Sequence, residues 1–60
     1  MANSKLRATL KNAQIPYWRI AEKLGVHENT ILRKMRTELS DNDRKMFEKA
    51  VAAILAERGE

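Results

Sequence analysis

The sequence predicts an all-α protein that folds as a single compact four-helix domain over residues 1–60. Apolar residues recur at the spacing of helix faces in four separate segments, and no segment shows the apolar–polar alternation of a strand. Residues typical of helix ends separate these segments. A chain of 60 residues has room for one small core, so the four helices must share it.

The first predicted helix begins at a cap on Asn3 or Ser4 and ends near Ala13. Its apolar residues Leu6, Leu10 and Ala13 are spaced i, i+4 and i+7, which makes a narrow stripe. Such a helix is marginal in isolation, so we expect it to depend on packing against the rest of the domain.

The second predicted helix begins near Pro16 and ends at Leu24. Proline disfavours helix at the residue before it and suits the first turn of a helix. We expect Ile20, Ala21 and Leu24 to face the core, and Gly25 to end the helix in the left-handed conformation.

The third predicted helix begins near Glu28 and ends near Arg36 or Thr37. Its acidic first turn and basic last turn agree with the helix dipole. The apolar residues that we expect to lie in the core around this helix are Val26, Ile31, Met35 and Leu39.

The fourth predicted helix runs from about Asp41 to Glu57, and Gly59 follows as a stop signal. Ser40 is a strong N-cap, and Asp43 is expected to complete a variant of the capping box. The apolar stripe of this helix is wider than one packing contact with the other three small helices requires. Its members are Met46, Phe47, Ala50, Val51, Ile54 and Leu55.

Charge is unevenly distributed along the chain. Residues 1–36 carry eight basic and two acidic side chains, a balance of +6, whereas residues 37–60 carry four basic and six acidic side chains, a balance of −2; together these give the formal net charge of +4. A basic surface can serve solubility alone. Because the excess lies with the first three predicted helices, we favour a nucleic-acid partner.

Several classes of protein find no support in the sequence. No apolar run is long enough for a membrane span, and the N-terminus lacks the apolar block of a signal peptide. The absence of cysteine fits a cytoplasmic protein. His27 has no carboxylate or nucleophile arranged beside it for catalysis, and one histidine is too few for a metal site. We therefore expect no enzyme, cofactor, metal or small-molecule ligand.

Residues 17–36 have the pattern of two helices joined by a tight turn. Ala21 is small enough to let two helices approach closely, Gly25 supplies backbone freedom at the turn, and Ile31 is placed to lock the second helix onto the first. A helix-turn-helix of this kind presents its second helix to the DNA major groove, while the first helix lies near the backbone.

Side chains at the start and on the outward side of the third helix are candidates for reading bases. Asn29 suits adenine and Arg33 suits guanine, whereas Glu28 can accept from cytosine or orient Arg33. Leu32 can meet a thymine methyl group. The candidate base-reading residues are Glu28, Asn29, Leu32, Arg33 and Arg36. The candidates for contact with the DNA backbone are Tyr17, Trp18, Arg19, His27, Thr30 and Lys34.

Each candidate also has a purely structural interpretation. Asn29 and Thr30 can satisfy free amides at the helix start, and His27 can act as the cap. Leu32 can be an isolated apolar residue on the surface. The basic side chains of this helix can form a solvated face. For Trp18 we favour a place in the core over base stacking, because three aromatic residues do not make a stacking platform.

These residues resemble the Cro/C1-type (XRE-like) helix-turn-helix regulators of bacteria and phages. The resemblance rests on Ile20-Ala21-x-x-Leu24-Gly25-Val26 followed by Asn29-Thr30-Ile31, and the order of four helices extends it. The wider run over residues 15–40 looks like small regulators of mobile elements in Gram-positive bacteria. The resemblance implies a shortened lambda-repressor-like fold and sequence-specific binding of double-stranded DNA, usually as a dimer.

The resemblance assigns the family's reading positions to the same five residues of the third helix, and its backbone contacts to Tyr17 and Trp18. The chain departs from the family at two positions. Lys34 stands where a buried apolar residue is usual, a role that we expect Met35 to take. His27 stands where Ser or Thr usually caps the third helix.

We expect a small transcriptional regulator of phage or mobile-element origin that acts as a repressor. The alanines outside the core stripe of the fourth helix, Ala52, Ala53 and Ala56, offer a two-fold contact for a homodimer, although they can equally be exposed helix formers. Two alternatives remain: an excisionase-like accessory factor that bends DNA, and a protein-interaction module built on the same scaffold.

Overall fold

The computed structural model describes residues 2–59 as four helices joined by short connections. The helices are α1 (Ser4–Asn12), α2 (Tyr17–Leu24), α3 (Glu28–Lys34) and α4 (Asp41–Glu57). No strand occurs between residues 2 and 59. The predicted all-α, four-helix class is confirmed.

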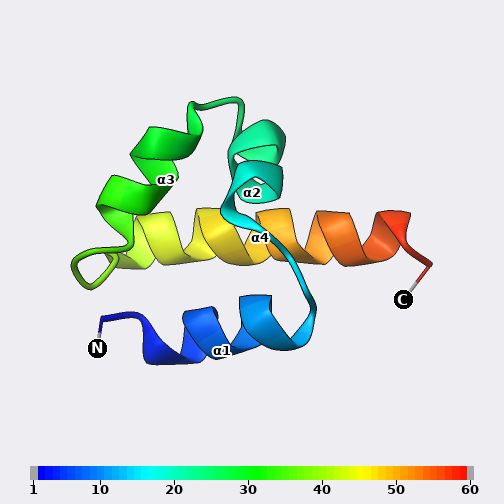
Figure 1. Cartoon of the computed structure of the whole chain (residues 1–60), viewed down its shortest axis with the longest axis horizontal. Coiled ribbons are helices and arrows are strands. Elements are labelled where there is room, and N and C mark those ends of the chain that lie inside the picture. Colours follow the sequence, from blue (N-terminus) through cyan, green and yellow to red (C-terminus); the bar gives the residue numbers. More distant parts are fainter. Residues whose placement is uncertain (1, 60) are drawn as a thin grey trace.

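The long helix α4 organises the other three. Figure 1 shows α1 along one side of α4, and α2 and α3 on the other side. The Cα trace extends over 31 × 22 × 18 Å. None of the helices within residues 2–59 is long and apolar enough to cross a membrane.

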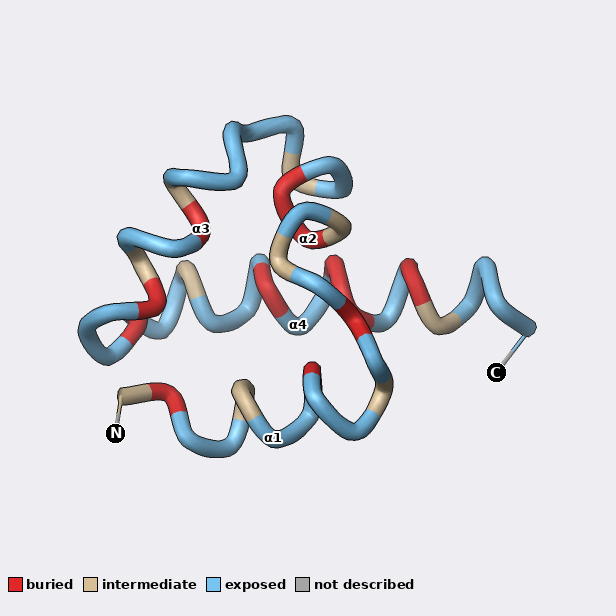
Figure 2. The backbone as a smooth tube through the Cα atoms, viewed as in Figure 1, coloured by how far each residue is buried: buried red, intermediate tan, exposed pale blue. Residues whose placement is uncertain are grey.

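One apolar core holds the helices together. On α4, Phe47, Ala50, Val51 and Ile54 follow the spacing i, i+3, i+4 and i+7, and all four are buried. Figure 2 shows these buried positions recurring along α4. Full burial of a large apolar side chain contributes roughly 1.5–3 kcal/mol, so this stripe accounts for much of the stability. The remaining buried apolar residues are Leu10, Ile15, Ile20, Ala21, Ile31, Met35 and Leu39.

The turn after α2 has the predicted left-handed glycine. Gly25 has φ 69° and ψ 32°. Its N–H donates to the carbonyl of Glu22, and the N–H of Val26 donates to the carbonyl of Ala21 at 3.0 Å. This pair of bonds is a Schellman motif, which satisfies the last carbonyls of α2 and turns the chain toward α3.

The predicted cap of α4 is half confirmed. The Ser40 hydroxyl accepts a hydrogen bond from the Asp43 N–H at 3.2 Å. The Asp43 side chain does not complete a capping box. Its carboxylate instead accepts from Lys34 Nζ at 3.1 Å, because the end of α3 lies beside the first turn of α4.

Three helix ends differ from the prediction. Asn3 precedes α1 with φ 58°, but its side chain makes no cap bond because it is bonded to the connection between α3 and α4. The helix α1 ends at Asn12, one residue early. The helix α3 ends at Lys34, and Met35 is its C-cap, whereas the sequence predicted an end at residue 36 or 37.

Two apolar residues predicted to lie in the core are exposed. Val26 is 39% exposed and Met46 is 47% exposed. Met46 directly precedes the stripe that starts at Phe47, so it points to another side of α4. The Val26 N–H donates to the Ala21 carbonyl at the end of α2, while much of the residue stays exposed. Ile15, in the connection before α2, is buried although the sequence analysis did not place it in the core. The partly buried apolar residues that pack against this core are Leu6, Ala13, Tyr17, Leu24 and Leu55.

Candidate functional site

The helix α3 turns one side to the core and leaves the other to solvent. Ile31 is fully buried and Met35 is 1% exposed. Figure 2 shows α3 as mostly exposed, with buried stretches in the helix and near its C-terminal end. All five residues predicted to read bases are exposed. They are Glu28, Asn29, Leu32, Arg33 and Arg36.

Three of these residues follow one another along α3 and the turn after it, and we call them the reading ridge. Asn29 and Arg33 are spaced i, i+4 on α3, so they share one side of the helix. Arg36 lies in the turn that follows the C-cap Met35, where its N–H donates to the Arg33 carbonyl at 3.3 Å. Leu32 and Glu28 flank this ridge at the i, i+4 spacing. All five side chains therefore lie on the exposed part of α3 and of the turn after it.

The two arginines of the ridge are available to a partner. Neither the Arg33 side chain nor the Arg36 side chain makes a hydrogen bond or ion pair within residues 2–59. Glu28 is also unpaired over the same residues, so it does not orient Arg33 in the free protein. These charges can meet an outside group without first breaking a contact inside the chain.

Other cations near the motif are tied to acidic residues. Lys34 pairs with Asp43 at 3.1 Å, and Arg19 pairs with Glu22 at 2.7 Å and with Glu57 at 3.5 Å. Exposed pairs of this kind contribute about 0.2–1 kcal/mol, so an outside anion can compete for them at small cost. Arg19 and Lys34, both predicted to contact the DNA backbone, are thus less freely available than Arg33 and Arg36.

His27 takes the role of the usual cap at the start of α3. Its Nδ1 accepts a hydrogen bond from the Asn29 N–H at 3.1 Å. The capping interpretation of His27 is therefore confirmed. The side chains of Asn29 and Thr30 make no hydrogen bond among residues 2–59, so they do not serve the helix start themselves.

Met35 takes the buried position that the resemblance expected near Lys34. Met35 is buried at the end of α3, and Lys34 beside it is half-buried and reaches Asp43. The helix therefore has an apolar anchor at its end and keeps its basic side chains at the surface.

Trp18 lies outside the core, so the core placement was wrong. Its side chain is 51% exposed, and the Arg19 guanidinium lies 5.8 Å from the centroid of its ring. The reason is helical spacing: Tyr17, Ile20, Ala21 and Leu24 follow i, i+3, i+4 and i+7 along the inner side of α2. Trp18 falls outside that stripe, while Tyr17 packs partly against the core.

The outer side of α4 carries the alanines proposed for a dimer contact. Ala52, Ala53 and Ala56 are all exposed. Met46 adds one large apolar side chain to the exposed surface of α4.

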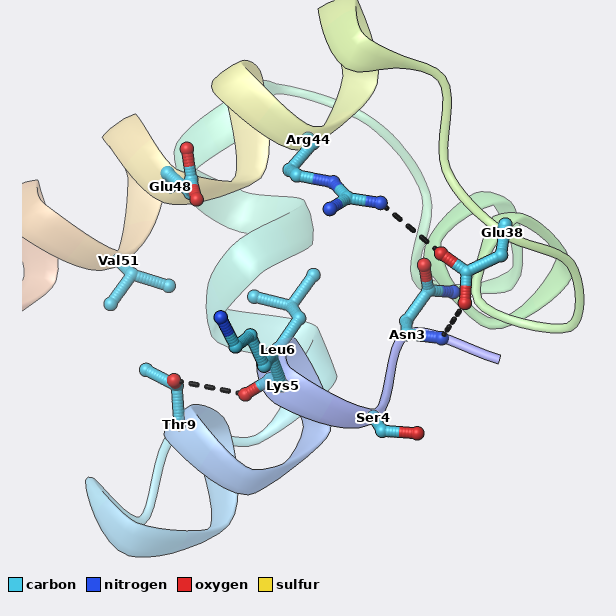
Figure 3. Close-up of a pocket in the computed structure, with 9 residues that line it drawn as sticks. All are labelled: Asn3, Ser4, Lys5, Leu6, Thr9, Glu38, Arg44, Glu48 and Val51. Atoms are coloured by element: carbon cyan, nitrogen blue, oxygen red, sulfur yellow. Dashed lines mark hydrogen bonds and ion pairs between the residues drawn. The ribbon is translucent and has the colours of Figure 1, made fainter. Parts of the chain in front are cut away.

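A hollow of about 460 Å³ lies between α1 and α4, away from the exposed side of α3. Figure 3 shows Leu6 and Val51 in it, with Arg44 paired to Glu38 at 3.1 Å. Glu38 also accepts from the Asn3 N–H at 2.7 Å. No pattern in the sequence indicates this hollow. Within residues 2–59, no group of three or more His, Cys, Asp or Glu residues could hold a metal ion.

No protein-family model, curated protein or solved structure matches the chain.

Proposed function

We propose that the protein binds double-stranded DNA with α3 in the major groove and reads its sequence there. The observation that carries this proposal is the ridge of Asn29, Arg33 and Arg36, whose side chains have no partner among residues 2–59. A major groove admits one α-helix and offers a distinct pattern of donors and acceptors at each base pair.

The reading side chains have different partners in this proposal. Arg33 donates to O6 and N7 of a guanine, and the Asn29 amide pairs with an adenine. Glu28 accepts from the amino group of a cytosine, and Leu32 contacts a thymine methyl group. Arg36, at the end of the ridge, reads the far side of the site.

The start of α2 and the ends of α3 meet the DNA backbone in this proposal. Backbone contacts set the register of a protein on the duplex without reading sequence. The exposed indole of Trp18 and the hydroxyl of Tyr17 donate to phosphate oxygens. The remaining backbone residues are Arg19, His27, Thr30 and Lys34.

The role that we propose is a small cytoplasmic repressor of phage or mobile-element origin. It acts as a homodimer in which two copies of α4 meet through Ala52, Ala53 and Ala56. A two-fold dimer predicts a palindromic site. Sedimentation equilibrium tests the contact: Ala53→Arg should give a monomer, whereas Ala8→Arg, the same change at an exposed position of α1, should leave the dimer intact.

Selection from a random duplex library tests the function directly. We expect enrichment of a palindromic site, with an affinity that falls steeply between about 50 mM and about 200 mM salt because phosphate contacts release counterions. Absence of any detectable binding at about 50 mM salt would refute the DNA proposal and leave the protein-interaction alternative. A large bend in a gel-shift phasing assay would favour the excisionase-like alternative.

A further inference from the structure

We propose that Arg7 positions the reading helix, because its single guanidinium joins the start of α2 to the end of α3. The inference rests on the proposed DNA binding and adds a residue of α1 to it. Arg7 touches no base or phosphate in this proposal. It determines where α3 lies relative to α2, and hence where the reading ridge meets the bases.

The guanidinium of Arg7 donates three hydrogen bonds in three directions. Nη1 donates to the Tyr17 hydroxyl at 3.2 Å, and Nη2 donates to the Met35 carbonyl at 2.7 Å. Nε donates to the Ala2 carbonyl at 2.8 Å. Tyr17 is the first residue of α2, and Met35 is the C-cap of α3. One side chain of α1 thus spans the two helices of the motif.

The end of α3 needs such a partner. The last carbonyls of a helix find no N–H donor within the helix itself. Here the Met35 carbonyl accepts from Arg7 and, at 3.2 Å, from Asn3 Nδ2, which also donates to the Thr37 carbonyl at 2.9 Å. Asn3 ties α3 to the connection that follows it, and Arg7 alone of the two also reaches α2.

The position of this contact matters for reading. The start of α3 is already held by the Gly25 turn and the His27 cap. Arg36 directly follows the Met35 carbonyl that Arg7 binds, so a loose end of α3 would displace Arg36 first. A functional constellation has to be held within about 0.5 Å of its productive geometry by packing and supporting hydrogen bonds, which Arg7 supplies at this end of α3.

The three hydrogen bonds of Arg7 depend on the shape of its guanidinium, so a lysine substitution can remove them while it keeps the positive charge. All three acceptors are neutral oxygens, and Arg7 pairs with no carboxylate among the described residues. Lysine keeps the positive charge but replaces the planar fork by a compact ammonium that cannot reach three separated oxygens. The Tyr17 oxygen accepts from Arg7, which leaves the hydroxyl proton of Tyr17 to donate outward.

Arg58 provides a matched control. Its guanidinium donates to the carbonyls of Ala13 and Gln14, which joins the end of α4 to the connection after α1. It therefore has the same chemistry as Arg7, with carbonyl acceptors and no carboxylate, but it touches neither end of α3.

The experiment compares Arg7→Lys and Arg58→Lys with the parent chain. Affinity is measured for the selected site, for that site with the base pairs opposite Arg36 changed, and for random duplex. We expect Arg7→Lys to lower the ratio of selected to random affinity about tenfold, as the loss of a base contact does. The affinity of Arg7→Lys for random duplex should change by no more than about twofold, because the charge is kept. Arg58→Lys should leave both the affinity ratio and the affinity for random duplex unchanged.

Three results would overturn the positioning role. One is an unchanged affinity ratio in Arg7→Lys, and another is an equal loss of the ratio in Arg58→Lys. The third is an Arg7→Lys chain that stays unfolded by circular dichroism where Arg58→Lys folds, since Arg7 would then hold the whole domain. A parent chain that binds no duplex would instead refute the proposed function, so the two failures are distinguishable.

Discussion

Replacing Arg33 by alanine tests the reading ridge at its centre. Arg33 is exposed and its side chain makes no hydrogen bond or ion pair within residues 2–59, so its truncation breaks no polar contact there. Alanine is also the better helix former. We therefore expect the free energy of unfolding to change by no more than about 0.5 kcal/mol, as for other surface substitutions. Any change in DNA affinity then comes from the interface.

The expected change in binding depends on what Arg33 contacts. A bidentate contact with guanine is worth about 1–3 kcal/mol of discrimination, which corresponds to a loss of roughly 5-fold to 150-fold for the selected site. A contact with phosphate alone would weaken selected and random duplexes alike. We expect the first pattern, with the loss concentrated at one base pair.

Lys45→Ala is the matched control for this measurement. Lys45 is an exposed cation of α4 without a described partner, so its removal changes the net charge by the same amount. Fluorescence anisotropy with the selected duplex and its single-base variants gives both affinities. The reasoning about Arg33 fails if Arg33→Ala weakens all duplexes equally, or if Lys45→Ala produces the same loss at the same base pair.

Three further predictions concern the scaffold. Gly25→Ala should destabilise the domain by about 1–2 kcal/mol in chemical denaturation, because φ 69° is strained for a side chain even though no atom lies within 4 Å of the new Cβ; an unchanged midpoint would contradict the left-handed turn. Ser40→Ala should cost about 1 kcal/mol through the lost cap to the Asp43 N–H, and Ser40→Asp should restore most of it, which a failed rescue would disprove. Trp18 is the sole tryptophan and is half exposed, so acrylamide should quench its fluorescence in the native protein, and bound DNA should reduce that quenching. Native fluorescence that acrylamide does not quench would place the indole in the core.

Helical spacing made most of the fold predictable. The stripe over Phe47, Ala50, Val51 and Ile54 is local in sequence, and the left-handed glycine follows from the absence of a side chain at the turn. The same helical spacing also predicts that Trp18 lies outside the core. Tyr17, not Trp18, shares a stripe with Ile20 and Leu24, and this pattern outweighs the general tendency of large aromatic residues to be buried.

The contacts of Arg7 and Asn3 had no signal in the sequence. Arg7 bonds to a carbonyl 28 residues away, and Asn3 bonds to the Leu39 N–H, 36 residues away. Any arginine or asparagine can serve a main-chain group, so residue type alone does not select the partner. The Met35 carbonyl that both side chains bind belongs to the C-cap of α3, so these contacts lie where α3 ends.

The sequence by itself determined which segments become helices, where the tight turn falls and which side of α3 carries the candidate readers. These features depend on spacing within a few residues, where the geometry of the helix is already known. Only the tertiary structure decided which cations are free. Within residues 2–59, Arg33 and Arg36 pair with no carboxylate, while Lys34 and Arg19 each pair with an acid of α4. The pairs with α4 depend on distances between helices, and those distances exist only once the helices pack.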